Sequence, residues 1–147
     1  MKHWLIGFVL LCSACTPGSF ANPVSTTKAP AGTGRIVTID VNLTQHPDGY
    51  LPTDVTLNIG DAVNFNNSDG FNHTATLIPG ATTFPTAYPF TAAALTETGS
   101  TLSSGWSSGA LTAGSTSQTL IADKAGTYLY GCFYHYGHPM QATINVQ

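Results

Sequence analysis

Apolar residues alternate with polar ones in short runs along most of the chain, and this two-residue period limits its fold more than any other feature. Gly, Pro, Asn and Asp residues, which favour turns, separate the runs. Since successive side chains of a β-strand point to opposite faces of a sheet, each run predicts a strand with one buried face. The runs begin at Val37, Val55, Val63, Ala75, Leu120, Thr127 and Ala142. Because no segment shows a sustained helical pattern, and only residues 92–95 are compatible with one short helix, the sequence predicts an all-β sandwich.

Length and charge limit the number of domains and the class of partner. With 147 residues, the chain fits a single domain whose core needs no disulfide. Only 7% of the residues are charged, and the four Lys and Arg residues are spread along the chain. So few cations do not neutralise a phosphate backbone, and this excludes a conventional nucleic-acid-binding protein.

The N-terminal residues have the pattern of an export signal. Lys2 precedes an apolar run over residues 4–11, and small residues at positions 19 and 21 indicate cleavage after Ala21. The alternative is a lipoprotein signal that ends before Cys15, with a lipid anchor on that cysteine as the only attachment to a membrane. Both alternatives place the folded part in the periplasm or elsewhere outside the cytoplasm. We therefore expect a signal peptide over residues 1–21, a flexible linker rich in small residues and Pro over residues 22–34, and one domain over residues 35–147.

Residues with metal-binding side chains gather near the C-terminus. Cys132, His135 and Met140 follow one another in a loop between the last two predicted strands, and His73 lies at the start of another predicted strand. A thiolate, two imidazoles and a thioether form a soft, mixed donor set that suits copper in both of its common oxidation states. Zinc matches less well because thioethers are not among its usual ligands. Haem attachment is excluded because the chain lacks a Cys-x2-Cys-His motif.

The stretch from Gly126 to Val146 resembles, without a gap, the copper loop of plastocyanin and related small type 1 blue copper proteins, the cupredoxins. Residues 65–77 resemble the segment that carries the first His ligand of that family. The resemblance implies a Greek-key β-sandwich of seven to eight strands that holds one type 1 copper ion. It assigns the metal ligands to His73, Cys132, His135 and Met140. It also implies an electron-transfer protein and not an enzyme.

Three residues beside these ligands depart from the plastocyanin pattern. Asn72 and Tyr134 stand where plastocyanins usually have Pro, and Thr74 stands where Asn is frequent. Residues in such positions tune a copper potential through hydrogen bonds to the ligands. The resemblance therefore assigns ligands here but not a reduction potential.

Two further histidines are weighed as ligands. His138 is an alternative to His135, with a Cys-x5-His spacing, but the Cys-x2-His spacing favours His135 and makes His138 a titratable neighbour of the site. His46 lies in a stretch rich in turn residues, where we expect a solvated side chain without a metal role.

Four functions fit a chain of this kind. An exported electron carrier is favoured, with redox partner proteins docking transiently on aromatic side chains near His135 and the carrier acting as a monomer. A periplasmic copper-binding or copper-delivery protein of the same fold is the main alternative, but it would be expected to have additional exposed Met or His clusters. A redox enzyme would need a second metal site, for which only His46 and His138 remain. If the chain were a metal-free adhesion domain, the presence of all four metal-binding residues at this spacing would be a coincidence.

Overall fold

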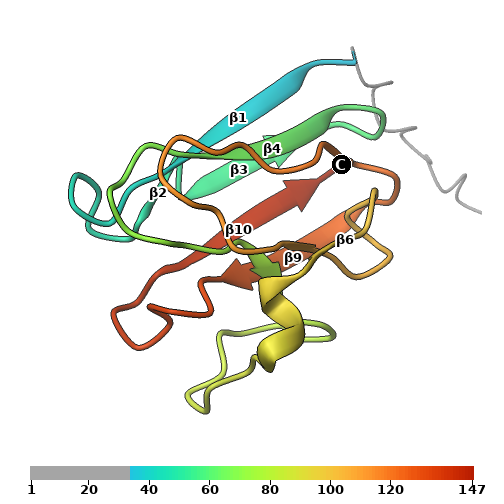
Figure 1. Ribbon diagram of the computed structural model, residues 1–147. Helices are drawn as coiled ribbons and strands as arrows, with labels where there is room; N and C mark the ends of the chain where they lie inside the picture. Colours follow the sequence, from blue (N-terminus) through green and yellow to red (C-terminus); the bar gives the residue numbers. More distant parts are fainter. Residues whose placement is uncertain (1–33) are drawn as a thin grey trace, which may run out of the picture.

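The computed structural model describes residues 34–147, which form two β-sheets packed face to face (Figure 1). The first sheet has the strand order β2 (Tyr50–Leu51), β1 (Ile36–Val41), β4 (Ala62–Asn67), β8 (Leu120–Ile121). The second has the order β3 (Asp54–Leu57), β10 (Gln141–Val146), β9 (Gly126–Gly131), β5 (Thr76–Leu77), β7 (Ser107–Ser108), β6 (Glu97–Thr98). In Figure 1, β1 and β4 lie above the layer formed by β9 and β10.

The strand pairing confirms the predicted all-β sandwich. β1 runs parallel to β4, with Ile39 opposite Phe65, and β3 runs parallel to β10, with Val55 opposite Ile144. These parallel pairs require the chain to cross between sheets, as in a Greek-key arrangement. Residues 34–147 contain ten strands, more than the seven to eight expected. The additional strands β2, β6 and β7 contain two residues each, too few for an alternating pattern to be visible in the sequence.

The core between the sheets consists of the inward-facing members of the alternating runs. Ile39 and Ile144 are fully buried, and four aromatic rings pack together at the centre. Ring centroids are 4.9 Å apart between Tyr50 and Tyr130 and 5.6 Å apart between Phe65 and Trp106. Burial of rings of this size dominates core energetics, so packing between the sheets stabilises the sandwich.

A long connection over residues 78–96 forms a second, smaller apolar cluster outside the sheets. It contains the 3-10 helix η1 (Ala92–Leu95), which confirms the short helix expected there and appears in yellow below the sheets in Figure 1. Ile78, Phe90 and Ala94 pack against Tyr136 of the loop between β9 and β10. The Tyr136 hydroxyl donates to the Pro85 carbonyl at 2.8 Å. This connection therefore supports one side of the loop that carries the predicted ligands.

The signal peptide over residues 1–21, the alternative lipoprotein site before Cys15 and nearly all of the linker over residues 22–34 lie outside the described residues. Among residues 34–147, no helix has the length and hydrophobicity needed to cross a membrane.

Candidate metal centre

The loop between β9 and β10 is closed by backbone hydrogen bonds at its two ends. The N–H of Cys132 donates to the carbonyl of Met140 at 3.1 Å, which continues the antiparallel pairing of Gly131 with Gln141. Within the loop, the N–H of His138 donates to the carbonyl of His135 at 2.9 Å. The sheet register therefore places the backbones of Cys132 and Met140 side by side, and both side chains are fully buried.

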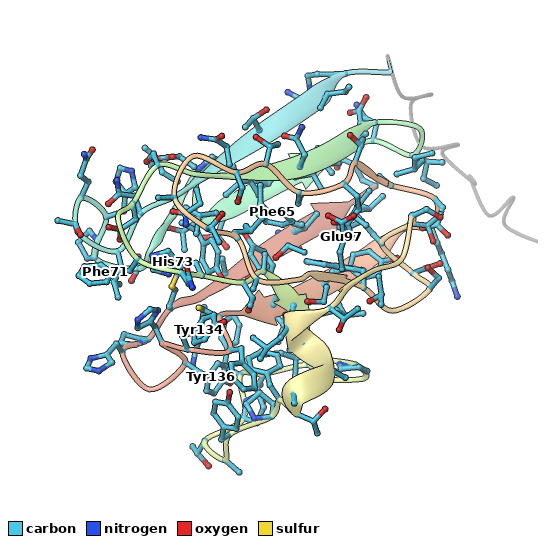
Figure 2. All side chains as sticks on the ribbon, in the orientation of Figure 1. Phe65, Phe71, His73, Glu97, Tyr134 and Tyr136 are labelled. Atoms are coloured by element: carbon cyan, nitrogen blue, oxygen red, sulfur yellow. The ribbon has the colours of Figure 1, made fainter. Side chains whose placement is uncertain are left out.

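The position of His73 is fixed by a separate segment. Its N–H donates to the Leu111 carbonyl at 3.1 Å, and the Leu111 N–H donates back to the His73 carbonyl at 2.8 Å. The His73 side chain has no exposed surface. In Figure 2, His73 lies at the same end of the sandwich as Phe71 and Tyr134, away from the C-terminus.

The structure brings His73, Cys132 and His135 together as a possible metal site. The Nδ1 atoms of the two histidines are 3.2 Å apart, and the Cys132 Sγ lies 3.6 Å from His135 Nδ1 and 3.9 Å from His73 Nδ1. A point equidistant from the three atoms lies about 2.1 Å from each, close to ordinary metal bonds of about 2.0–2.1 Å to imidazole and about 2.3 Å to thiolate. The three donors therefore fit one metal ion.

A carboxylate fixes which nitrogen of His73 faces this point. The Asp69 Oδ2 atom lies 3.1 Å from His73 Nε2. Burial alone would raise the pKa of Asp69, but hydrogen bonds from His73, Thr44 and Gly70 outweigh it and lower the pKa to about 2. Since an ionised carboxylate only accepts hydrogen bonds, we assign the proton to Nε2 of His73. The lone pair on Nδ1 is then directed at the other two donors.

The thiol of Cys132 lies in a buried environment that contains N–H donors. Burial raises its pKa, while the N–H groups of Thr74, Tyr134 and His135 act in the opposite direction. The Thr74 N–H lies 3.4 Å from Sγ, and the Thr74 hydroxyl accepts a hydrogen bond from the Phe133 N–H. These contacts join the His73 segment to the cysteine loop. They favour the thiolate form, which is the form that binds a metal.

His135 is neutral near pH 7 and lies at the surface end of the site. Burial lowers its pKa, and the charges of His73 and His138 lower it further. The side chain is half-buried and lines a shallow depression together with Gly70, Phe71, Asn72 and Tyr134. It is therefore available to bind a metal on one side and solvent or a partner on the other.

The side chain of Met140, whose backbone pairs with that of Cys132, packs closely against the backbone of Gly49. Gly49 has a φ of +69°, and a Cβ atom built on it would lie 2.6 Å from Met140 Cγ and 2.9 Å from Met140 Sδ. Only a residue without a side chain fits at that position. The turn before β2 thus forms one wall of the space that the thioether occupies.

Within the described part of the chain, the two remaining histidines lie outside the cluster. His138 is exposed, as expected for a neighbour of the site. His46 lies in a turn, but its ring is partly buried and not fully solvated as predicted, because Nε2 contacts Asp40 Oδ2 at 3.0 Å.

The spacing of the candidate ligands did not indicate Asp69 or Gly49 as parts of the site. Asp69 precedes His73 by four residues, and an acidic residue close to a candidate ligand was a usable signal. Gly49 had no such signal, because its contact with Met140 arises only from tertiary packing.

Comparisons with known proteins agree with this geometry. A family model described as copper binding proteins of the plastocyanin/azurin family matches residues 37–147. No curated protein matches the chain significantly in a sequence comparison.

Among solved structures, the fold is similar to a purple cupredoxin from Nitrosopumilus maritimus, with a TM-score of 0.51 and 17% identity over 76% of this chain and 99% of that one. It is also similar to auracyanin B, with a TM-score of 0.52 and 22% identity over 81% of this chain and 98% of that one. An auracyanin from the photosynthetic bacterium Roseiflexus castenholzii matches with a TM-score of 0.50 and 18% identity over 80% of this chain and 99% of that one. These structures share the sandwich fold. Since the family model spans most of the sequence, the chain belongs to the plastocyanin/azurin family of copper-binding proteins, the cupredoxins, which generally use copper for electron transfer.

Proposed function

We propose that this protein carries single electrons between redox partners by cycling one type 1 copper ion between Cu(I) and Cu(II). Its ligands are His73, Cys132 and His135, with Met140 as a weak axial donor. The observation that supports this proposal is the triangle of two nitrogens and one sulfur whose size fits a single metal ion. Such a mixed N and S donor set, with a nearby thioether, suits copper in both oxidation states.

Copper in such a site gains or loses one electron without any covalent bond being made or broken between the protein and its partner. The protein keeps the donors in nearly the same place in both oxidation states. His73 is fixed through its backbone by Leu111 and through its ring by Asp69, and Cys132 is fixed by the Met140 carbonyl. Because the donors are fixed by the fold, little reorganisation accompanies electron transfer. This is the property that a carrier requires and that an enzyme with an open metal position does not have.

Partner docking is proposed at the depression beside His135. Phe71 and Tyr134 beside it have exposed fractions of 66% and 41%, and none of the five lining residues has a formal charge when His135 is neutral. An uncharged apolar surface of this kind favours short-lived contacts that do not depend on long-range steering. We expect electron exchange with a partner to change little with ionic strength, and Tyr134→Lys to slow exchange without removing the metal.

We also propose that the protein is a monomer located outside the cytoplasm, in the periplasm or an equivalent compartment. The export pattern of residues 1–21 supports the location. Mass spectrometry of the mature protein distinguishes cleavage after Ala21 from acylation at Cys15.

Adding Cu(II) to the metal-free protein tests the redox proposal. An intense blue thiolate-to-copper absorption band that bleaches with a reductant is the expected result. His135→Gly removes that band, whereas the matched variant His138→Gly retains it, and Met140→Leu retains copper but raises the reduction potential. Absence of a blue band, or rapid transfer of copper to a weak chelator, would refute an electron carrier, and rapid transfer would favour copper delivery.

A further inference from the structure

The Asp69 carboxylate accepts hydrogen bonds from two segments of the chain at once. Its Oδ2 accepts from the N–H of Leu43 at 2.9 Å and of Thr44 at 3.2 Å, and lies 3.1 Å from Nε2 of His73. Its Oδ1 accepts from the Thr44 hydroxyl at 2.9 Å and from the Gly70 N–H at 2.7 Å. The residue is buried, so these protein groups replace water around the charge.

We propose that Asp69 is a positioning residue for the copper site, which orients His73 and favours Cu(II) over Cu(I). The inference rests on the proposed function, because it assumes that His73 binds copper. Asp69 does not touch the metal position itself. It acts through the imidazole ring by holding the proton on Nε2 and directing Nδ1 to the metal.

The charge balance at the site gives the direction of the effect. Within residues 34–147, no Lys or Arg forms an ion pair with Asp69, and the ring of His73 beside it has no charge when Nε2 holds the only proton. A buried centre that contains the Asp69 carboxylate and the Cys132 thiolate is neutral with Cu(II) and has one net negative charge with Cu(I). Because an uncompensated buried charge is unfavourable, the carboxylate stabilises the oxidised state and lowers the reduction potential.

Asp69→Asn removes the charge while preserving much of the shape. The amide oxygen occupies the Oδ2 position, because the Leu43 and Thr44 N–H groups and the ring N–H of His73 all need an acceptor there. The amide nitrogen then takes the Oδ1 position. There it donates a hydrogen bond to the Thr44 hydroxyl, which rotates to accept it, while the Gly70 N–H loses its acceptor. The variant therefore tests mainly the charge.

Two control variants separate charge from loop support. Thr44→Val removes the hydroxyl hydrogen bond to Asp69 but keeps the carboxylate and its contact with His73. Asp123→Asn makes the same charge change at a carboxylate whose hydrogen-bond partners, Ser103 and Thr101, are not part of the metal centre.

The first measurement is the reduction potential of the copper-loaded protein and its variants, with the blue absorption band recorded alongside. We expect Asp69→Asn to weaken Cu(II) binding at least tenfold relative to Cu(I) binding. This raises the potential by about 59 mV for each tenfold change, and the band shifts with it. Thr44→Val and Asp123→Asn are expected to remain close to the wild type. If Thr44→Val raised the reduction potential as much as Asp69→Asn, Asp69 would only support the loop and the proposal would be wrong. An unchanged reduction potential in Asp69→Asn would also overturn the proposal.

The second measurement needs neither copper nor a variant that folds. Nitrogen NMR of the ring of His73 in the metal-free wild-type protein reports which nitrogen holds the proton. A proton on Nε2 is the expected result, and a proton on Nδ1 overturns the proposal even if Asp69→Asn does not fold. If the wild type gives no blue band but His73 holds its proton on Nε2, the copper-carrier function fails while the contact between Asp69 and His73 stands.

Discussion

Gly49 offers a direct test of how the fold positions Met140. Its φ of +69° is strained for any residue with a side chain, and a Cβ atom there would lie 2.6 Å from Met140 Cγ and 2.8 Å from Met140 Cε. Carbon atoms in contact are normally about 3.5–4.0 Å apart, so Gly49→Ala has to displace the thioether by roughly 1 Å. The substitution therefore combines a backbone cost with a packing cost.

The two costs can be separated by magnitude. A left-handed backbone conformation costs about 1–2 kcal/mol in a residue with a Cβ atom. Overpacking of a core costs about 1–3 kcal/mol more. Gly80 provides the matched control, because its φ is +70° and a Cβ atom there meets no heavy atom within 4 Å. We expect Gly80→Ala to lose about 1–2 kcal/mol of the free energy of unfolding, and Gly49→Ala to lose about 2–5 kcal/mol.

Denaturant unfolding of the metal-free variants measures both losses, and absorption spectra of the copper-loaded variants report the axial donor. Gly49→Ala should alter the blue band and the potential, because it moves the sulfur of Met140, whereas Gly80→Ala should leave both unchanged. If the two variants lose the same stability and both keep the wild-type spectrum, the contact between Gly49 and Met140 does not position the thioether.

Other perturbations have equally specific outcomes. Cys132→Ser should abolish the blue band but keep the far-ultraviolet circular dichroism of a folded sandwich, because the core lies between the sheets and does not require the metal. Tyr134→Pro removes one N–H donor from the Cys132 sulfur. Because that hydrogen bond favours the reduced state of the site, electrochemistry should show a lower reduction potential, by about 40 mV for each kcal/mol by which the reduced state is destabilised relative to the oxidised state. Although burial would raise the pKa of Asp123, hydrogen bonds from Ser103 lower it, so its contribution to stability is present above pH 4 and is lost as the pH falls through the lowered pKa. Asp123→Asn should therefore be less stable than the wild type at pH 6 in denaturant unfolding, with the difference becoming smaller as the pH falls below 4.

The alternating pattern predicted those strands that are long enough to display it. In β10, Ala142, Ile144 and Val146 are buried while the residues between them are partly exposed. The pattern failed where a strand ended early. Ile59 belongs to the predicted run that begins at Val55, but β3 ends at Leu57 and the Ile59 side chain is exposed. The two-residue strands β2, β6 and β7 were missed because they are defined by pairing with distant segments and not by their own sequence.

The donors of the site were predictable because three of them share one loop with a regular spacing. Apart from the position of Asp69 four residues before His73, the groups around them were not predictable, because their contacts connect segments that are distant in the sequence. Asp69 contacts Leu43 and Thr44, and Gly49 contacts Met140. Neither relation is visible in a periodic pattern or in the spacing of the ligands.

These contacts meet in a single structural element, the turn over residues 43–49 between β1 and β2. One end of the turn binds the carboxylate that orients His73, and the other end forms a wall against the Met140 side chain. His73 and Met140, two proposed ligands from different segments, are thus supported by the same short piece of backbone. We therefore expect a change in this turn to move the imidazole and the thioether together, because the packed interior leaves little space in which either could adjust alone. The copper site is therefore set by the packing of this turn against the sandwich as well as by the loop that supplies three of its donors.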